Sequence, residues 1–174
     1  MFKCIRRLVI LGLVFFAGFQ IHDTYVNVHN VLQYKTMVKE ILATNDTTAN
    51  VDLVLAMIYT ETKGSDGDVM QSSESTSGVA NSITDSQTSI RQGVTLLSKN
   101  LTLAEEKGVD VWTAVQAYNF GTAYIDYVAN HGGKSTIALA TEYSKNVVAP
   151  SLGNTTGESY FYHHPIALIS GGKL

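Results

Sequence analysis

The stretch that decides the fold covers residues 51–75 and reads VDLVLAMIYTETKGSDGDVMQSSES. Its first nine residues are apolar nearly all round, which is typical of a helix buried at the centre of a domain. Gly64 ends this helix, and a polar segment rich in Ser, Thr, Gly, Asp and Asn continues to Ser86. Loops of this length inside compact domains are usually functional or disordered. The sequence therefore predicts a buried central helix, with Glu61 near its end, that leads directly into a long loop.

Helical spacing of apolar residues on both sides of this stretch predicts a mainly helical domain. The turn at 45–48 supplies a candidate N-cap for the central helix. Only two prolines interrupt the chain, and both lie in its last quarter, so long helices are permitted upstream. The expected helices cover residues 23–43, 51–59, 82–106, 111–118 and 122–148, the last being one helix or a pair broken at 130–133.

Composition limits the number of domains and the kinds of partner. A chain of 174 residues with 45% hydrophobic content can form one domain with a proper core and a small addition at one end. The formal net charge of -3 provides no basic field for nucleic acid, which we therefore exclude as a partner. The single cysteine, Cys4, excludes an intrachain disulfide and a cysteine-based metal site.

The N-terminus has the pattern of a membrane-targeting segment. Lys3, Arg6 and Arg7 precede the uncharged residues 8–19, as in a positive region followed by an apolar one. Twelve helical residues span about 18 Å, which is short of the roughly 30 Å core of a bilayer, and no A-x-A cleavage site is present. We expect residues 1–22 to be a signal anchor or signal peptide and 23–174 to lie outside the membrane, anchored or secreted.

Glu61 is the candidate for acid catalysis. It follows Met57 and Ile58 by four and three residues, so on a helix it shares a face with apolar side chains. Apolar surroundings disfavour the charged form of a carboxyl group. A carboxylic acid that keeps its proton can donate it to a leaving-group oxygen, as the general acid does in glycoside hydrolysis. The alternative is a helix-terminal glutamate that points into water.

Three separated segments resemble one known superfamily when they are taken in order. Glu61, then Met70-Gln71, then the residues 117–121 (AYNFG) resemble the goose-type lysozyme and lytic transglycosylase superfamily. Residues 68–75 (DVMQSSES) are similar to the lysozyme-like domain of Gram-positive cell-wall hydrolases, which occurs alone behind a membrane anchor or fused to a peptidase. The resemblance covers roughly residues 51–148.

This resemblance implies both a fold and an activity. The implied fold is mainly α, of the α+β lysozyme-like type, with helices around the buried central one and a long active-site loop. The implied activity is cleavage of the β-1,4 bond between N-acetylmuramic acid and N-acetylglucosamine in peptidoglycan, with Glu61 as general acid and no cofactor. One alternative is a lytic transglycosylase that gives 1,6-anhydro products, and another is a non-catalytic, surface-exposed glycan-binding protein.

The resemblance also implies a set of substrate-binding positions. Gln71 can donate and accept hydrogen bonds, which suits an N-acetylated sugar or the anchoring of a loop. Tyr118 offers a ring to a pyranose face or to the core, and Asn119 can hold an acetamido group or Glu61. Gly121 permits a tight turn or a close approach of the sugar, whereas Met70 is expected to pack the loop onto the core. The predicted glycan-binding residues are Met70, Gln71, Ser72, Tyr118, Asn119 and Gly121.

A second carboxylate, needed as base or nucleophile for hydrolysis, is not defined by the resemblance. Goose-type enzymes carry an aspartate shortly after the Met-Gln pair, where this chain has Ser73. We predict Asp68 as the catalytic base, with Asp66 as the second choice and Glu74 left to solvent. A transglycosylase needs only one glutamate, so a chain without a second carboxylate stays compatible with that alternative.

No metal site is expected. Residues 66–68 (DGD) begin a calcium-loop pattern that is not completed. His131 and the adjacent pair 163–164 lack a suitably spaced partner for zinc. The last four residues, 171–174, look like the start of an uncompleted hairpin, which is compatible with truncation at that end.

Overall fold

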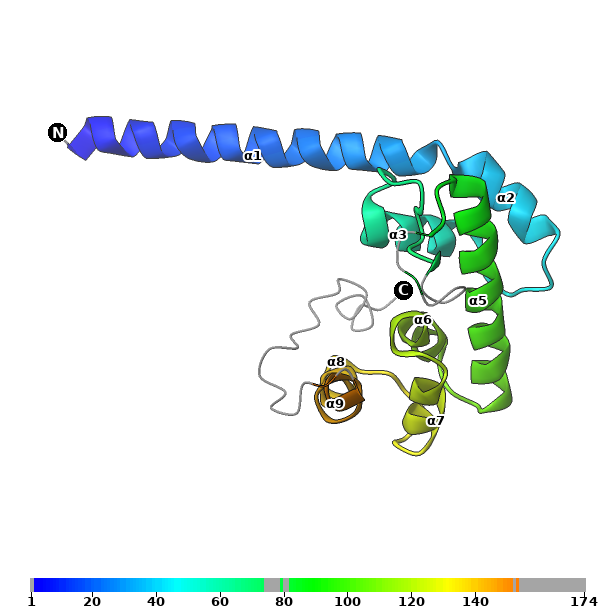
Figure 1. Cartoon of the computed structure of the whole chain (residues 1–174). Coiled ribbons are helices and arrows are strands. Elements are labelled where there is room, and N and C mark those ends of the chain that lie inside the picture. Colours follow the sequence, from blue (N-terminus) through cyan, green and yellow to red (C-terminus); the bar gives the residue numbers. More distant parts are fainter. Residues whose placement is uncertain (1, 74–78, 80–81, 152, 154–174) are drawn as a thin grey trace.

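The computed structural model describes residues 2–73, 79, 82–151 and 153, and Figure 1 shows it to be built from helices. No strand occurs within these ranges, which confirms a mainly α fold and leaves the expected minor β component without a counterpart there. The elements are α1 (Phe2–Leu32), α2 (Lys35–Ala43), α3 (Val51–Thr62), α5 (Ser86–Glu106), α6 (Val111–Phe120), α7 (Ala123–Ala129), α8 (Ile137–Tyr143), the π-helical turn η1 (Ser144–Val148) and α9 (Ala149–Ser151).

Helix α1 projects as a single long rod from one side of the molecule (Figure 1). Among the side chains that the structure describes in its first two thirds, the large apolar ones are exposed, for example Phe15 at 80%. By length and composition this part could cross a membrane, a property that it shares with signal sequences. The prediction of one helix over 23–43 is wrong, because α1 ends at Leu32 and a turn closed by the Tyr34 N–H on the Val31 carbonyl (3.0 Å) precedes α2.

Helix α3 is the buried central helix that the apolar run predicts. Four of its residues, Val54, Leu55, Met57 and Ile58, are buried. Its N-cap is Asn50, whose side chain accepts a hydrogen bond from the Leu53 N–H (2.8 Å), so the predicted cap at 45–48 is wrong by a few residues. Lys63 ends the helix in the left-handed conformation (φ 55°), which places Glu61 in the last turn.

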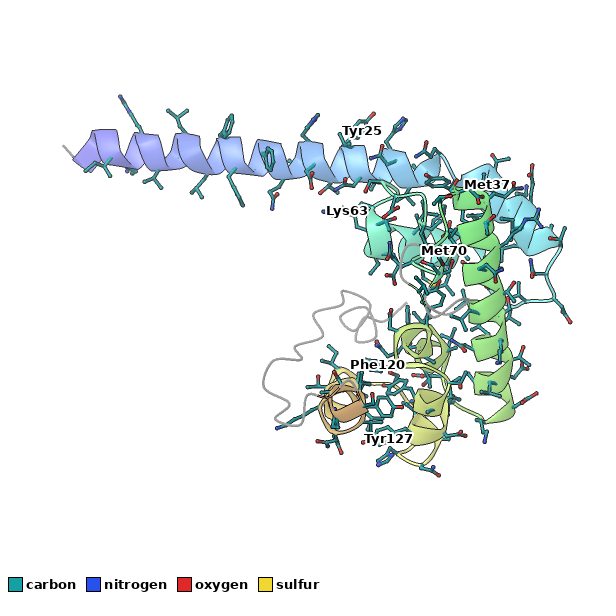
Figure 2. The ribbon with its side chains drawn as sticks, viewed as in Figure 1. Tyr25, Met37, Lys63, Met70, Phe120 and Tyr127 are labelled. Carbon is teal, nitrogen blue, oxygen red and sulfur yellow. The ribbon has the colours of Figure 1, made fainter. Side chains whose placement is uncertain are left out.

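Two groups of buried side chains hold the helices together. The larger one joins α1, α2, α3, α5 and α6 and includes two loop residues, Val69 and Met70, that are 0% exposed. The smaller one is aromatic and joins α6, α7 and α8 around Tyr124, which contacts Phe120 and Tyr143 edge to face. Figure 2 shows Met70 beside α3 and Phe120 in the separate group near α7 and α8. The candidate site residues come from α3, the loop after it and α6.

Candidate active site

The loop after α3 folds around the carboxylate of Asp68, which is 0% exposed. Its Oδ1 accepts hydrogen bonds from the Ser72 N–H (2.9 Å), the Ser72 hydroxyl (3.3 Å) and the Ser89 hydroxyl (2.7 Å). Its Oδ2 accepts from the Ser73 N–H (3.0 Å) and from the Ser73 hydroxyl. Asp68 therefore closes the loop on itself and ties it to α5 through Ser89.

These hydrogen bonds determine the ionisation of Asp68. Burial alone would raise the pKa of this carboxyl group, because it disfavours the charged form. The hydroxyls of Ser73 and Ser89 and the N–H groups of Ser72 and Ser73 oppose burial, and the pKa of Asp68 lies below its ordinary value. Asp68 is thus a buried anion at neutral pH, stabilised by hydrogen-bond donors of Ser72 and Ser73 in the loop and of Ser89 in α5.

Met70 connects this loop to two further helices. Its N–H donates to the Ser89 hydroxyl (3.0 Å), and its carbonyl accepts from the Tyr118 hydroxyl (2.8 Å). Gly93 makes room for this contact, because a Cβ there would lie 2.6 Å from Met70 Sδ and 2.8 Å from the Tyr118 hydroxyl. The Thr62 hydroxyl donates to the Val69 carbonyl (2.9 Å). Helices α3, α5 and α6 together therefore fix the backbone of residues 69–70.

Gln71 is the exposed residue at the tip of this fixed backbone. It adopts the left-handed conformation (φ 48°), which is uncommon for a residue other than glycine. Its N–H donates to the Asp68 carbonyl (2.9 Å), and its side-chain amide lies 3.3 Å from the same oxygen. The loop presents Gln71 to solvent between two buried neighbours, Met70 and Ser72. Backbone strain of this kind is concentrated at functional sites, which supports a functional role for Gln71.

Glu61, in the last turn of α3, lies near enough to Tyr118 of α6 for its charge to act on that side chain. The side chain is partly exposed, but its Oε1 is buried. Burial raises the pKa of the Tyr118 hydroxyl, and the neighbouring negative charges of Glu61 and Asp68 raise that pKa further. Tyr118 therefore stays a neutral hydrogen-bond donor at all physiological pH values. The structure thus brings Glu61 and Asp68 of the α3 region into one electrostatic neighbourhood with Tyr118 of α6.

The end of α6 supplies the last two predicted residues. Asn119 has a buried side-chain NH₂ group that makes no hydrogen bond to any residue the structure describes. Gly121 ends α6 with φ 79°, and a Cβ there would meet nothing within 4 Å. Gly121 therefore serves a turn that other residues adopt only with strain, and the space beside it is open.

The position of Ser72 does not fit the role predicted for it. Ser72, predicted to bind substrate, is 0% exposed and directs its hydroxyl to Asp68 and to the Ser89 carbonyl (3.1 Å). This geometry favours a structural role. Asp66 is exposed and accepts a hydrogen bond from the Asp68 N–H (3.2 Å). Glu74 and the histidine pair at 163–164 lie outside the described residues.

Sequence reasoning missed two residues of α5, namely Ser89 and Gly93. Gly93 carries a signal that is visible in the sequence, because a glycine inside a helical stripe costs about 1 kcal/mol relative to alanine and usually has a packing reason. Ser89 carries no such signal, since a serine near a helix start has several local uses. Among the described residues, no group of three or more His, Cys, Asp or Glu side chains could hold a metal ion.

A helical fold with Glu61 at the end of its buried helix indicates a lysozyme-like protein. Residues 28–174 match the family described as lysozyme-like. The chain belongs to this family, as the motifs predicted.

Similar proteins include both close and distant relatives. The chain is 68% identical over its whole length to the pneumococcal vaccine antigen A homolog of Streptococcus pyogenes, of which it covers 87%. It is 36% identical over 121 residues to the bifunctional muramidase/DL-endopeptidase CwlT of Bacillus subtilis, a match that spans 70% of this chain and 36% of CwlT. A crystal structure from Staphylococcus aureus, described as similar to lipoprotein of the NLP/P60 family, matches 72% of this chain and 41% of that one at 35% identity and a TM-score of 0.65.

Proposed function

We propose that this protein cleaves the glycan strands of peptidoglycan as an N-acetylmuramidase, with Glu61 as the general acid. Membership of the lysozyme-like family supports peptidoglycan hydrolysis at the level of the family, and one distant relative is named a muramidase. The observation that carries the proposal is the position of Glu61. Its carboxyl group sits at the end of a buried helix, with one oxygen buried, and its charge helps to raise the pKa of Tyr118.

The residues around Glu61 suggest how each step proceeds. Glu61 donates its proton to the glycosidic oxygen between N-acetylmuramic acid and N-acetylglucosamine as the bond breaks. A water molecule then forms the new bond to C1 of N-acetylmuramic acid and returns a proton to the Glu61 carboxylate. Gln71, held in the left-handed conformation at the loop tip, donates and accepts hydrogen bonds to an N-acetyl group. The contact of Asn119 with an acetamido group stays a prediction, because its NH₂ group is buried in the structure. In this proposal Met70 and Tyr118 position the loop, since the tyrosine hydroxyl is already bonded to the Met70 carbonyl.

The burial of Asp68 bears on the choice between hydrolysis and transglycosylation. A base that activates water must reach that water, yet Asp68 is fully buried and accepts hydrogen bonds from three serines. The role of Asp68 as catalytic base stays a prediction, and its surroundings favour a role in organising the loop. A transglycosylase needs no second carboxylate, because the muramoyl 6-hydroxyl closes an anhydro ring. The burial of Asp68 therefore favours this reaction as the second candidate function.

Mass spectrometry of the products separates the two reactions. Purified peptidoglycan is incubated with the full chain in detergent, and the released muropeptides are weighed. Hydrolysis gives products with reducing ends, whereas transglycosylation gives products lighter by one water. A non-catalytic glycan-binding protein would release neither product and would instead sediment with insoluble peptidoglycan.

We further propose that residues 1–22 anchor the protein in the membrane and that residues 23–174 form the lysozyme-like domain on the extracytoplasmic side. The exposed apolar side chains of α1 support the anchor, and the basic residues Arg6 and Arg7 at its start support the orientation. A cleaved signal peptide is the alternative, and the mass of the mature protein distinguishes the two.

A further inference from the structure

The contact between α1 and α3 links the apolar segment directly to the helix that carries Glu61. Helix α1 continues without interruption from its exposed apolar part to Leu32. Its last turn is part of the domain, because Val31 is only 4% exposed and belongs to the main core. The end of α1 lies beside α3 in Figure 1. No flexible linker therefore separates the candidate anchor from the catalytic domain.

Gly64 is the residue of closest approach in this contact. It is buried, it follows the C-cap of α3 and it adopts φ 72°. A Cβ on Gly64 would lie 2.9 Å from the Asn30 carbonyl oxygen and 3.1 Å from the Val31 nitrogen, both backbone atoms of α1. The Tyr34 hydroxyl, just after α1, lies 3.4 Å from the Gly64 carbonyl. Since Gly64 is three residues from Glu61, the backbone of α1 packs against the turn that ends the catalytic helix.

The geometry of α1 sets a distance along this connection. Ile21 is the last of the strongly exposed aliphatic residues before the polar part of the helix, at 72% exposure. Ten residues separate it from Val31, which corresponds to about 15 Å of helix at 1.5 Å per residue. A helix of this kind is stiff, whereas a flexible linker of equal length would let the domain sample many heights and orientations.

We propose that α1 and the Glu61 helix form one rigid unit, which holds the active site at a fixed height and orientation above the membrane. The substrate class that fits this arrangement is glycan strands attached to the same membrane through a lipid, rather than strands in the distant wall. This inference rests on the proposed function and specifies where that function acts. Gly64 is a positioning residue in this arrangement, because it acts through the docking of α1.

An insertion experiment tests the rigid connection with two variants of equal length. Seven residues are inserted between His22 and Asp23, either as a helical Ala/Glu/Lys sequence, which adds about two turns, or as a Gly/Ser sequence. The full chains are reconstituted in vesicles that carry lipid-linked glycan strands, and cleavage is compared with that of detached strands in solution. We expect the Gly/Ser insertion to lower the preference for tethered strands severalfold, because a flexible connection lowers the effective concentration, and we expect all forms to cleave detached strands equally.

The outcomes separate this inference from the proposed function. A wild-type chain that cleaves neither substrate contradicts the proposed function. A wild-type chain that cleaves both, with the same preference as the Gly/Ser variant, contradicts the rigid unit alone. The helical insertion keeps the connection stiff but raises the domain by about 10 Å, so we expect cleavage of tethered strands to move farther from the lipid-linked end. A helical insertion that leaves the cleavage position unchanged contradicts the fixed height and therefore the rigid unit.

Gly64→Ala tests the docking contact itself, with Gly108→Ala as its matched control. Gly108 has nearly the same backbone angle (φ 66°), but a Cβ there would meet nothing within 4 Å. Both variants introduce the same left-handed strain, and only Gly64→Ala places a methyl group against α1. We expect Gly64→Ala to lower the preference for tethered strands and Gly108→Ala to leave it unchanged. Equal preferences in the two variants would overturn the role of Gly64.

Discussion

Asp68 shows how one buried residue organises the loop beside the candidate site. Asp68→Ala leaves the buried N–H groups of Ser72 and Ser73 without an acceptor, and each buried unsatisfied donor costs about 1–3 kcal/mol. We expect a loss of about 2–5 kcal/mol in the free energy of unfolding, measured by urea denaturation. Asp66→Ala is the control, because Asp66 is exposed and surface changes stay within about 0.5 kcal/mol. A loss in Asp68→Ala no larger than in this control would contradict the organising role.

The lowered pKa of Asp68 predicts how the stability of the folded protein depends on pH. Because its folded pKa lies below the ordinary value of 3.8, the anion stabilises the folded state at pH values above the unfolded pKa. This contribution is lost as the pH falls through the lowered folded pKa. The difference in stability between the wild type and Asp68→Ala should therefore be constant near neutrality and shrink below about pH 4. A difference that grows on acidification would contradict a buried anion.

At the level of the helices, the fit between α5 and its neighbours depends on Gly93. Gly93→Ala places a methyl group 2.6 Å from Met70 Sδ and 2.8 Å from the Tyr118 hydroxyl. Alanine is the better helix former by about 1 kcal/mol, but overpacking costs about 1–3 kcal/mol. We expect net destabilisation by thermal unfolding, whereas Thr95→Ala on the exposed face of the same helix should be neutral or stabilising. A gain in stability for Gly93→Ala would show that Met70 and Tyr118 move aside without cost.

The sequence predicted those elements whose signals are local. The apolar run of α3 and the helical spacing of apolar residues in α5 and α6 predicted these helices within a few residues. The break after Leu32 could not be predicted, because the apolar residues on both sides of the turn keep helical spacing. The partners of Asp68 were missed for a related reason: Ser89 lies 21 residues away, and only the folded chain brings its hydroxyl to the carboxylate. A carboxylate in a Gly-flanked loop looks exposed until these donors are known.

At the scale of the whole molecule, the apolar part of α1 should determine where the protein resides. We expect the full chain to be recovered with membranes and to need detergent for extraction, because its exposed apolar side chains require a nonaqueous environment. A chain that begins at residue 23 keeps Val31 in the core and should remain folded by circular dichroism, but it should no longer sediment with membranes. A full chain that stays in the aqueous fraction without processing would contradict the anchor.

The central claim, that Glu61 is the general acid of a glycan-cleaving enzyme, is tested most directly by the rate at which purified peptidoglycan releases soluble muropeptides. The comparison uses the wild type, Glu61→Gln and the control Glu105→Gln, an exposed position on α5. A positioned general acid contributes about 10²–10⁴-fold to the rate. For Glu61→Gln we predict a loss of at least about 100-fold in the rate of muropeptide release, at unchanged thermal stability. For Glu105→Gln we predict no loss. Equal rates for Glu61→Gln and the wild type would contradict the account.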